Sequence, residues 1–304
     1  MPGPEPSYSE LRRKLRGAMV AIITPFNNGS IDEEKLRQLI EFQIVNGTKA
    51  IIPCGTTGES ATLTHEEHNR VIALTVEQVK GRIPVIAGTG SNDTAEAIRL
   101  TEKAKADGAD AALLICPYYN KPTQEGLHQH FKKVAETVDI PIFLYNIQGR
   151  TGINMEPATV VRLSELPNII GIKEASGNLK QAADIISQCP EEFIVVSGED
   201  YLTYPMLCIG GQGVISVVSN AAPRDMAALC QTYFDGKIEE ARKMFYKLMP
   251  LCNALFYETN PAPVKAALAM MGKIASDELR LPLVQMSEVN RKRLEDALKD
   301  YGLI

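Results

Sequence analysis

The feature that most constrains the fold of this chain is a series of eight short apolar runs within its first 220 residues. Each run is rich in Val, Ile and Ala, which is typical of strands buried on both faces of a parallel sheet. Helix-like segments separate most of the runs, and eight strand-then-helix units favour a closed (β/α)8 barrel, or TIM barrel, of the α/β class. The runs span residues 18–26, 49–55, 84–90, 111–119, 141–147, 169–176, 193–200 and 213–220.

Amphipathic segments between the runs supply the expected helices. Asn178 and Thr94 stand where helix N-caps are expected. An open doubly wound sheet is disfavoured, because such sheets often carry a Gly-rich dinucleotide turn after the first strand and none is visible after Phe26. The expected helices include residues 32–45, 65–80, 95–105, 124–138 and 179–188.

Three more helical segments follow the eighth run, which is more than one barrel unit needs. We therefore expect a polar N-terminal leader over residues 1–17, a barrel over residues 18–236 and a C-terminal helical extension over residues 237–304. The leader is Pro-rich at its start and is expected to be briefly helical before the first strand. The three C-terminal segments span residues 237–258, 261–271 and 287–301.

Composition and charge exclude several classes of protein. The chain has 304 residues, 45% of them hydrophobic, and a formal net charge of -5, so it has no general attraction to nucleic acid or to an anionic membrane. Its six cysteines are scattered without a C-x-x-C pair, which predicts a cytoplasmic location with neither disulfides nor a metal site. The apolar run that follows the basic residues 12–16 is too short to span a bilayer.

A single lysine interrupts the sixth apolar run. Lys173 follows Ile169-Ile170-Gly171-Ile172, and by the two-residue period of a strand it is expected to share a face with Ile169 and Gly171. An ammonium group buried without a partner is costly, so a lysine in such a place either pairs with a carboxylate or serves as a neutral amine. A neutral amine forms Schiff bases with carbonyl compounds. From this position alone, a structural ion pair and a nucleophile are equal alternatives.

Polar residues gather where the other runs end, and in such barrels the chemistry lies at the carboxyl ends of the strands. Tyr145 is expected to share a face with Phe143 and Ile147, so its phenol can converge with the amine of Lys173 as a proton shuttle, with Thr56 and a second tyrosine as relay. Two hydroxyls lie on a glycine-flanked turn at residues 55–60, where backbone N–H groups can approach a carboxylate. Each feature alone also fits a tight turn or packing, but together they predict a site.

Residues 55–60, 117–120, 145–152 and 169–177 form four motifs whose order and spacing resemble the dihydrodipicolinate synthase family. This family belongs to the pyruvate-dependent class I aldolase superfamily, which also contains N-acetylneuraminate lyase. The resemblance runs from about residue 18 to the C-terminus and implies a Schiff base between Lys173 and pyruvate. It implies Tyr145 as the general acid and base, Thr56 as its relay, and Tyr119 as a relay residue that reaches into the site of a neighbouring subunit.

The resemblance also implies how the substrates bind. Thr57 would hold the pyruvate carboxylate, with backbone groups near Gly198 and Ile215. The enamine would attack L-aspartate 4-semialdehyde and give 4-hydroxy-tetrahydrodipicolinate, an intermediate of diaminopimelate and lysine synthesis, with no metal or organic cofactor. Arg150 would clamp the semialdehyde carboxylate, because the guanidinium fork matches a carboxylate.

This chain departs from the family pattern next to that arginine. The family usually has a proline between Tyr-Asn and Arg-Thr-Gly, whereas this chain has Ile147-Gln148-Gly149, so we expect a looser turn at Arg150. Two alternatives therefore stay open. One is a related 2-oxo acid aldolase such as a sugar-acid lyase, and the other is a non-catalytic barrel that binds a small carboxylate.

The resemblance further implies assembly and regulation. A Tyr119 shared between subunits implies a homo-oligomer, a dimer of dimers. At a dimer interface, Glu96 would pair with the ε-ammonium of inhibitory L-lysine and Asn92 with its α-carboxylate. The alternative for His65 and His68 is a helix N-terminal turn, because their spacing is not that of a zinc site. The residues that match lysine-binding positions are Ser60, Ala61, His65, His68, Asn92, Glu96 and Tyr118.

Overall fold

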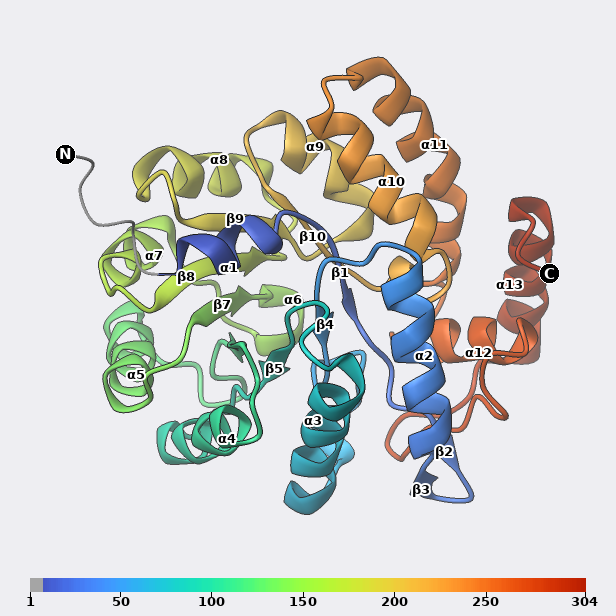
Figure 1. The fold of residues 1–304 in the computed structure, drawn as a ribbon, viewed down its shortest axis with the longest axis horizontal. Helices are drawn as coiled ribbons and strands as arrows, with labels where there is room; N and C mark the ends of the chain where they lie inside the picture. Colours follow the sequence, from blue (N-terminus) through green and yellow to red (C-terminus); the bar gives the residue numbers. More distant parts are fainter. Residues whose placement is uncertain (1–7) are drawn as a thin grey trace.

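The structure, a computed structural model that describes residues 8–304, contains a sheet of eight parallel strands closed into a barrel (Figure 1). The strand order is β4-β1-β10-β9-β8-β7-β6-β5, and a parallel bridge between Ile51 and Val85 joins its two ends. This confirms the predicted (β/α)8 fold. The barrel strands are β1 (Gly17–Ala21), β4 (Ile51–Ile52), β5 (Ile86–Gly88), β6 (Ala111–Ile115), β7 (Ile142–Asn146), β8 (Ile169–Glu174), β9 (Ile194–Ser197) and β10 (Gly213–Ser216).

Helices surround the barrel, and their ends follow local hydrogen bonding. Asn178 caps α8 by accepting from the backbone N–H of Gln181, as predicted. Asp93, rather than the predicted Thr94, caps α4, because a carboxylate oxygen is the stronger acceptor and the Thr94 hydroxyl instead lies 2.9 Å from His130 Nδ1. The helices of the ring are α2 (Glu33–Val45), α3 (His65–Val79), α4 (Thr94–Ala106), α5 (Gln124–Thr137), α7 (Pro157–Ser164), α8 (Leu179–Gln188), α9 (Thr203–Cys208) and α10 (Pro223–Phe234).

The amino end of the barrel is covered and its carboxyl end holds the loops. Helix α1 (Ser9–Lys14) lies across the amino end (Figure 1), and Leu15 behind it is buried in the interior cluster with Met19 and Phe143. The small elements include a hairpin and four short helices. They are β2 (Phe26–Asn27), β3 (Ser30–Ile31), η1 (Ser60–Thr62), α6 (Gln148–Thr151), η2 (Asp200–Leu202) and η3 (Val218–Asn220).

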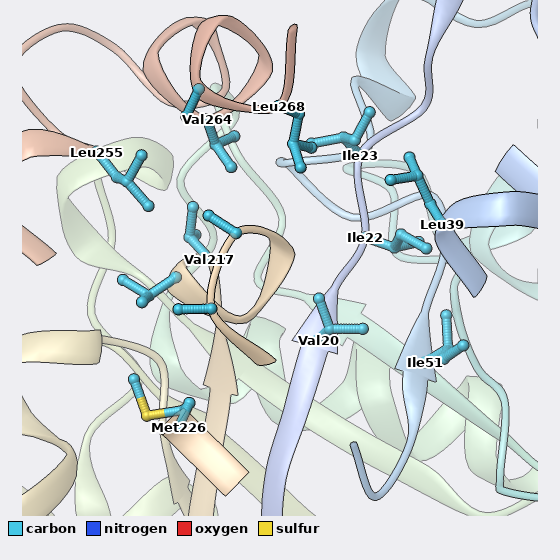
Figure 2. Close-up of a cluster of buried hydrophobic side chains, with 14 of the residues drawn as sticks. Val20, Ile22, Ile23, Leu39, Ile51, Val217, Met226, Leu255, Val264 and Leu268 are labelled. Carbon is cyan, nitrogen blue, oxygen red and sulfur yellow. The ribbon is translucent and has the colours of Figure 1, made fainter. Parts of the chain in front are cut away.

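The C-terminal helices share their core with the barrel. They are α11 (Ile238–Ala254), α12 (Ala262–Met270) and α13 (Glu288–Tyr301). Figure 2 shows Leu268 of α12 beside Ile23, and both belong to the cluster that contains Val20 of β1. The extension is therefore packed onto the carboxyl end of β1. Within residues 8–304, no helix combines the length and the apolar character needed to cross a membrane.

Candidate active site

Lys173 lies at the carboxyl end of β8, inside the barrel wall. Its side chain is buried, with 5% of the residue exposed, and it is paired in register with Tyr145 on β7. Its Nζ lies 4.3 Å from the centroid of the Tyr145 ring. Among residues 8–304 no carboxylate lies within salt-bridge distance of this nitrogen. The amine and the phenol therefore converge as the strand pattern predicts, and the ion-pair alternative for Lys173 has no partner in this part of the chain.

A register shift in β8 sets the direction of this lysine. Opposite Ile142 and Phe143 of β7 the pairing skips one residue, so Ile170 is the extra residue of a bulge. Ile169 consequently packs outside the strands, whereas Ile170 joins the interior cluster. The expectation that Ile169 shares a face with Lys173 is wrong, because the two-residue count is interrupted between them.

Small residues make room for the lysine. A Cβ on Gly198 would lie 3.0 Å from Cε of Lys173 and 2.5 Å from Cβ of Ala175. A Cβ on Gly171 would lie 2.5 Å from the backbone oxygen of Ile194. Any side chain at Gly198 would therefore displace the amine. This places Gly198 next to the predicted nucleophile.

On the outer side of β7 and β8, the residues next to Tyr145 and Lys173 in sequence are Asn146 and Glu174, and both are hydrogen-bonded. The Glu174 carboxylate accepts from Nδ2 of Asn146 at 3.1 Å, from Nε2 of Gln181 at 3.3 Å and from the backbone N–H of Ser176 at 2.7 Å. Asn146 Nδ2 also donates to Oδ1 of Asn154 at 2.9 Å. Polar pairing outside the barrel thus fixes the strand ends whose inner side chains are Tyr145 and Lys173.

A buried carboxylate joins the next two strands. Asp200 accepts from the Ser216 hydroxyl and from the backbone N–H groups of Val217 and Val218, at 3.0 and 3.2 Å for the two amides. Burial raises the pKa of Asp200, and these hydrogen bonds oppose the shift. The clamp fixes the end of β10, where Ile215 faces the barrel interior.

The Gly-Thr-Thr-Gly turn follows β4 and faces Tyr145. Thr56 and Tyr145 line one cavity of about 220 Å³ at the strand ends. The hydroxyl of Thr57 accepts from Nδ2 of Asn260 at 3.0 Å, which leaves its proton free to donate to a carboxylate. The hydroxyl of Thr24, in the segment that follows β1, donates to the backbone oxygen of Gly58 at 2.8 Å and holds the turn.

A second cavity, of about 460 Å³, lies beside Arg150. Arg150 belongs to α6, whose backbone bonds include Thr151 N–H to Ile147 oxygen at 3.1 Å, so the turn without the proline is still hydrogen-bonded. Arg150 Nη2 donates to the backbone oxygen of Asn260 at 3.3 Å. Glu199 lines the same cavity, and burial raises its pKa. Lys173 itself lines neither of the two cavities.

Five of the seven residues predicted for a lysine site line the 220 Å³ cavity together with Thr56 and Tyr145. Glu96 among them already pairs with Nε2 of His65 at 2.9 Å and accepts from the Ser91 hydroxyl. The five are Ser60, Ala61, His65, Glu96 and Tyr118. The other two lie elsewhere: His68 Nε2 is 2.9 Å from the backbone oxygen of Gly88, and the backbone oxygen of Asn92 accepts from Nδ2 of Asn120.

Tyr119 lies away from the other predicted catalytic residues. It is 90% exposed and has a left-handed backbone with φ of 71°. A non-glycine residue in this conformation stores strain, and such strain is common at functional positions. Within one chain, Tyr119 does not contribute to the site around Lys173.

Asn260, which is not among the residues predicted from the sequence, contacts both Thr57 and Arg150. It donates to Thr57 through its side chain and accepts from Arg150 through its backbone, and its Oδ1 is buried with no hydrogen-bond partner among residues 8–304. Asn260 lies in the C-terminal extension, about 200 residues from the turn that it contacts. The one available signal was a polar Thr-Asn-Pro run directly before an apolar helix.

These observations define a (β/α)8 barrel whose carboxyl end holds a buried lysine beside a phenol, with a cavity that this phenol and the Thr56 hydroxyl line, as in barrels that act through an amine. A model of the dihydrodipicolinate synthetase family matches residues 14–301, and the chain belongs to this family.

Named relatives agree with this assignment. The chain is 65% identical to the 4-hydroxy-tetrahydrodipicolinate synthase of Syntrophobacter fumaroxidans over 95% of this chain and 100% of that protein. A dihydrodipicolinate synthase of Acinetobacter baumannii solved with pyruvate is 46% identical, with a TM-score of 0.93, over 95% of this chain and 100% of that one. One from Cyanidioschyzon merolae solved with lysine bound is 41% identical, with a TM-score of 0.93, over 96% and 99%.

Proposed function

We propose that this protein condenses pyruvate with L-aspartate 4-semialdehyde to give 4-hydroxy-tetrahydrodipicolinate, a step toward diaminopimelate and lysine. Membership of the family and the 65% identity to a synthase of this name support the reaction. The single structural observation that carries it is the buried amine of Lys173 beside the ring of Tyr145, with no carboxylate partner in residues 8–304.

The chemistry follows from that amine. Nζ of Lys173 adds to the keto carbon of pyruvate, and loss of water gives an iminium ion. Loss of a methyl proton gives an enamine, whose carbon forms a bond with the aldehyde carbon of the semialdehyde. The aldehyde oxygen takes a proton and becomes the hydroxyl of the product, and the iminium ion forms again. The amino group of the semialdehyde then attacks the iminium carbon and displaces Lys173, which closes the ring and frees the enzyme.

In this proposal Tyr145 donates and accepts the protons of imine formation, and Thr56 relays them, because the two side chains line one cavity. Thr57 binds the pyruvate carboxylate together with backbone groups near Gly198 and Ile215. Arg150 binds the carboxylate of the semialdehyde, and its cavity is wide enough at about 460 Å³ for a four-carbon substrate.

We propose that Tyr119 completes the relay in the site of a second subunit. Its 90% exposure and strained backbone support a role outside its own chain. The protein would then act as a homo-oligomer, a dimer of dimers. Tyr119→Phe should lower kcat without changing the unfolding midpoint, and normal turnover by that variant would remove the cross-subunit relay.

Borohydride reduction in the presence of pyruvate tests the function. We expect the mass of the three-carbon adduct on the peptide that contains Lys173, and no such mass without pyruvate. A protein that binds pyruvate but shows no adduct would instead be a carboxylate-binding barrel. Assays with L-aspartate 4-semialdehyde and with N-acetylmannosamine under matched conditions separate the synthase from a sugar-acid lyase.

Regulation and location complete the proposal. We propose inhibition by L-lysine, supported by the family member from Cyanidioschyzon merolae that has lysine bound and by the cavity that Glu96 and Tyr118 line. Turnover unchanged at saturating L-lysine, with D-lysine as control, would reject this inhibition.

We also propose a cytoplasmic location, which agrees with six free cysteines and is tested by cell fractionation. We propose that the barrel ends at residue 236 and that the C-terminal helical extension begins at residue 237.

A further inference from the structure

A buried ion pair joins the C-terminal extension to the turn that carries Thr56 and Thr57. Nζ of Lys265 on α12 lies 2.6 Å from Oε1 of Glu59, and both side chains are 0% exposed. Oε2 of Glu59 accepts from the backbone N–H of Arg280 at 3.2 Å. The Lys265 ammonium also lies 4.1 Å from the centroid of the Phe26 ring, and the Arg280 guanidinium lies 4.5 Å from the same centroid.

Glu59 belongs to the substrate-binding turn itself. It follows Thr56-Thr57-Gly58 directly, and its backbone N–H donates to the oxygen of Thr56 at 3.1 Å. Its φ of 55° is left-handed, which is strained for a residue with a side chain, so the surroundings must hold it there. The carboxylate that fixes this residue is held by Lys265.

A second contact from the same C-terminal segment reaches the turn. Nδ2 of Asn260 donates to the Thr57 hydroxyl at 3.0 Å, five residues before Lys265 along the chain. The turn is therefore held at two points from one short stretch of the extension, and at a third by the Thr24 hydroxyl in the segment after β1. Movement of that stretch would move Thr57.

Packing alone would keep α12 in place. Apart from Lys265, this helix contains only Ala, Pro, Val, Leu and Met, and Figure 2 shows Val264 and Leu268 within the shared core. A buried ion pair is often no more stabilising than an apolar pair of the same size. What a charged pair adds is one defined separation and direction between two elements, because each charge requires the other.

We propose that the Glu59–Lys265 ion pair positions the Thr56–Thr57 turn for the carboxylate of the 2-oxo acid, so that Lys265 acts on pyruvate binding through Thr57. Lys265 is then a positioning residue, about 90 residues from the nucleophile in sequence and outside both cavities. The inference rests on the proposed function, because it needs pyruvate as the ligand of the turn.

A double-mutant cycle tests it. Lys265→Met, Thr57→Val and the combined variant are compared for KM of pyruvate, KM of the semialdehyde and kcat, well below their unfolding midpoints. We expect Lys265→Met to raise KM for pyruvate roughly 10-fold or more and to leave KM for the semialdehyde within about 2-fold. In the Thr57→Val background the same change should add little. If the two effects multiply, Lys265 does not act through Thr57 and the proposal is overturned.

Two further variants separate position from stability. Glu59→Gln/Lys265→Met removes both charges and leaves none buried without a partner. It replaces Lys265→Met in the test if that single variant does not fold. It should still show the raised KM for pyruvate, and recovery of the parent value would overturn the proposal. The matched control Arg291→Met breaks the Arg291–Asp277 pair of the same extension, and neither of these side chains hydrogen-bonds to the turn among residues 8–304. It should keep both KM values, and an equal rise in KM for pyruvate would also overturn the proposal.

Borohydride trapping distinguishes a failure of the proposed function from a failure of the positioning role of Lys265. If the parent protein gives no pyruvate adduct on Lys173, the proposed function fails and the positioning role fails with it. If the parent traps pyruvate and Lys265→Met reaches half-maximal trapping at the same pyruvate concentration, only the positioning role fails. A shift to higher pyruvate concentration in Lys265→Met, and none in Arg291→Met, is the expected result.

Discussion

Two lysines lie buried in this molecule, and they differ in what faces their nitrogen atoms. Lys173 at the end of β8 is 5% exposed, and Lys265 within α12 is 0% exposed. Each nitrogen lies over an aromatic ring, at 4.3 Å from the centroid of Tyr145 and 4.1 Å from that of Phe26. Only Lys265 has a carboxylate beside it within residues 8–304, that of Glu59 at 2.6 Å.

The difference teaches that burial by itself does not make a lysine a nucleophile. Burial lowers the pKa of Lys265, but the Glu59 carboxylate opposes the shift and favours the charged form. A charged ammonium has no lone pair for a carbonyl carbon. Among residues 8–304 Lys173 has no carboxylate within salt-bridge distance, and its neighbouring ring carries a hydroxyl that can move a proton, whereas Phe26 has none. One region therefore suits chemistry and the other suits a structural link.

The largest effect should come from removing the amine of Lys173. Lys173→Met keeps most of the side-chain volume but has no nucleophile, so we expect kcat to fall by about 10⁴-fold or more and the borohydride adduct to disappear. Lys265→Met should still form the adduct. Steady-state rates and peptide mapping of both variants make the comparison, and an adduct on Lys265 in the parent protein would break it.

The next largest effect is on stability, and we expect it at Lys265 and not at Lys173. Lys265→Met leaves the Glu59 carboxylate buried and unpaired, which should lower the free energy of unfolding by about 3–5 kcal/mol in urea titrations. The variant Glu59→Gln/Lys265→Met should recover most of that loss, because no charge is then left without a partner. If the single variant is as stable as the parent, the pair is not as buried as its 0% exposure indicates.

The sequence predicts the fold and part of the candidate site, but it does not predict the long-range contacts. The eight apolar runs predicted the barrel, and the lysine at position 173 in an apolar strand singled out the proposed nucleophile. The same reasoning applies to Lys265 within residues 262–270, yet no sequence pattern tells that its partner is Glu59, 206 residues away. Long-range contacts such as Asn260 with Thr57 depend on how the extension packs. The bulge at Ile170 is likewise set by pairing with β7 and not by local composition.

A buried histidine, His130, offers a third case, a basic group that forms no salt bridge among residues 8–304, although the charge of Asp93 favours its protonated form. Burial lowers the pKa of His130 to about 4, and its Nε2 has no hydrogen-bond partner in the part of the chain that the structure describes. Because the folded pKa lies below the usual 6.5, the unfolded chain binds the proton more tightly, so stability is full above about pH 6.5 and falls as the pH drops toward 4. The loss is up to about 3 kcal/mol.

Urea titrations at pH 8 and pH 5 measure this effect. His130→Asn keeps an acceptor or donor near the Thr94 hydroxyl but cannot titrate, so it should lose less stability between the two pH values than the parent does. Equal losses in the two proteins would assign the acid sensitivity to other groups, among which His68 is also buried with a lowered pKa.

Removing only the hydroxyl beside Lys173 sharpens the comparison, because it makes the ring at this lysine the same as the ring at Lys265. Tyr145→Phe should reduce kcat by roughly 10²-fold, since a positioned proton donor is lost while the amine remains. Trapping with borohydride should still label Lys173, only more slowly. A variant with parent turnover would show that another group moves the proton.

The smallest expected effect is the change in the free energy of unfolding caused by Lys173→Met, and its sign distinguishes the two lysines. A lysine buried without a carboxylate costs free energy in the folded state, so its replacement by an apolar side chain of similar length should raise the free energy of unfolding by about 1 kcal/mol. The same substitution at Lys265 lowers it. Opposite signs in matched urea titrations are expected if the first lysine is held for chemistry and the second for structure. A loss of stability at Lys173 would mean that the amine already has a partner in the folded protein, and the contrast between the two regions would no longer hold.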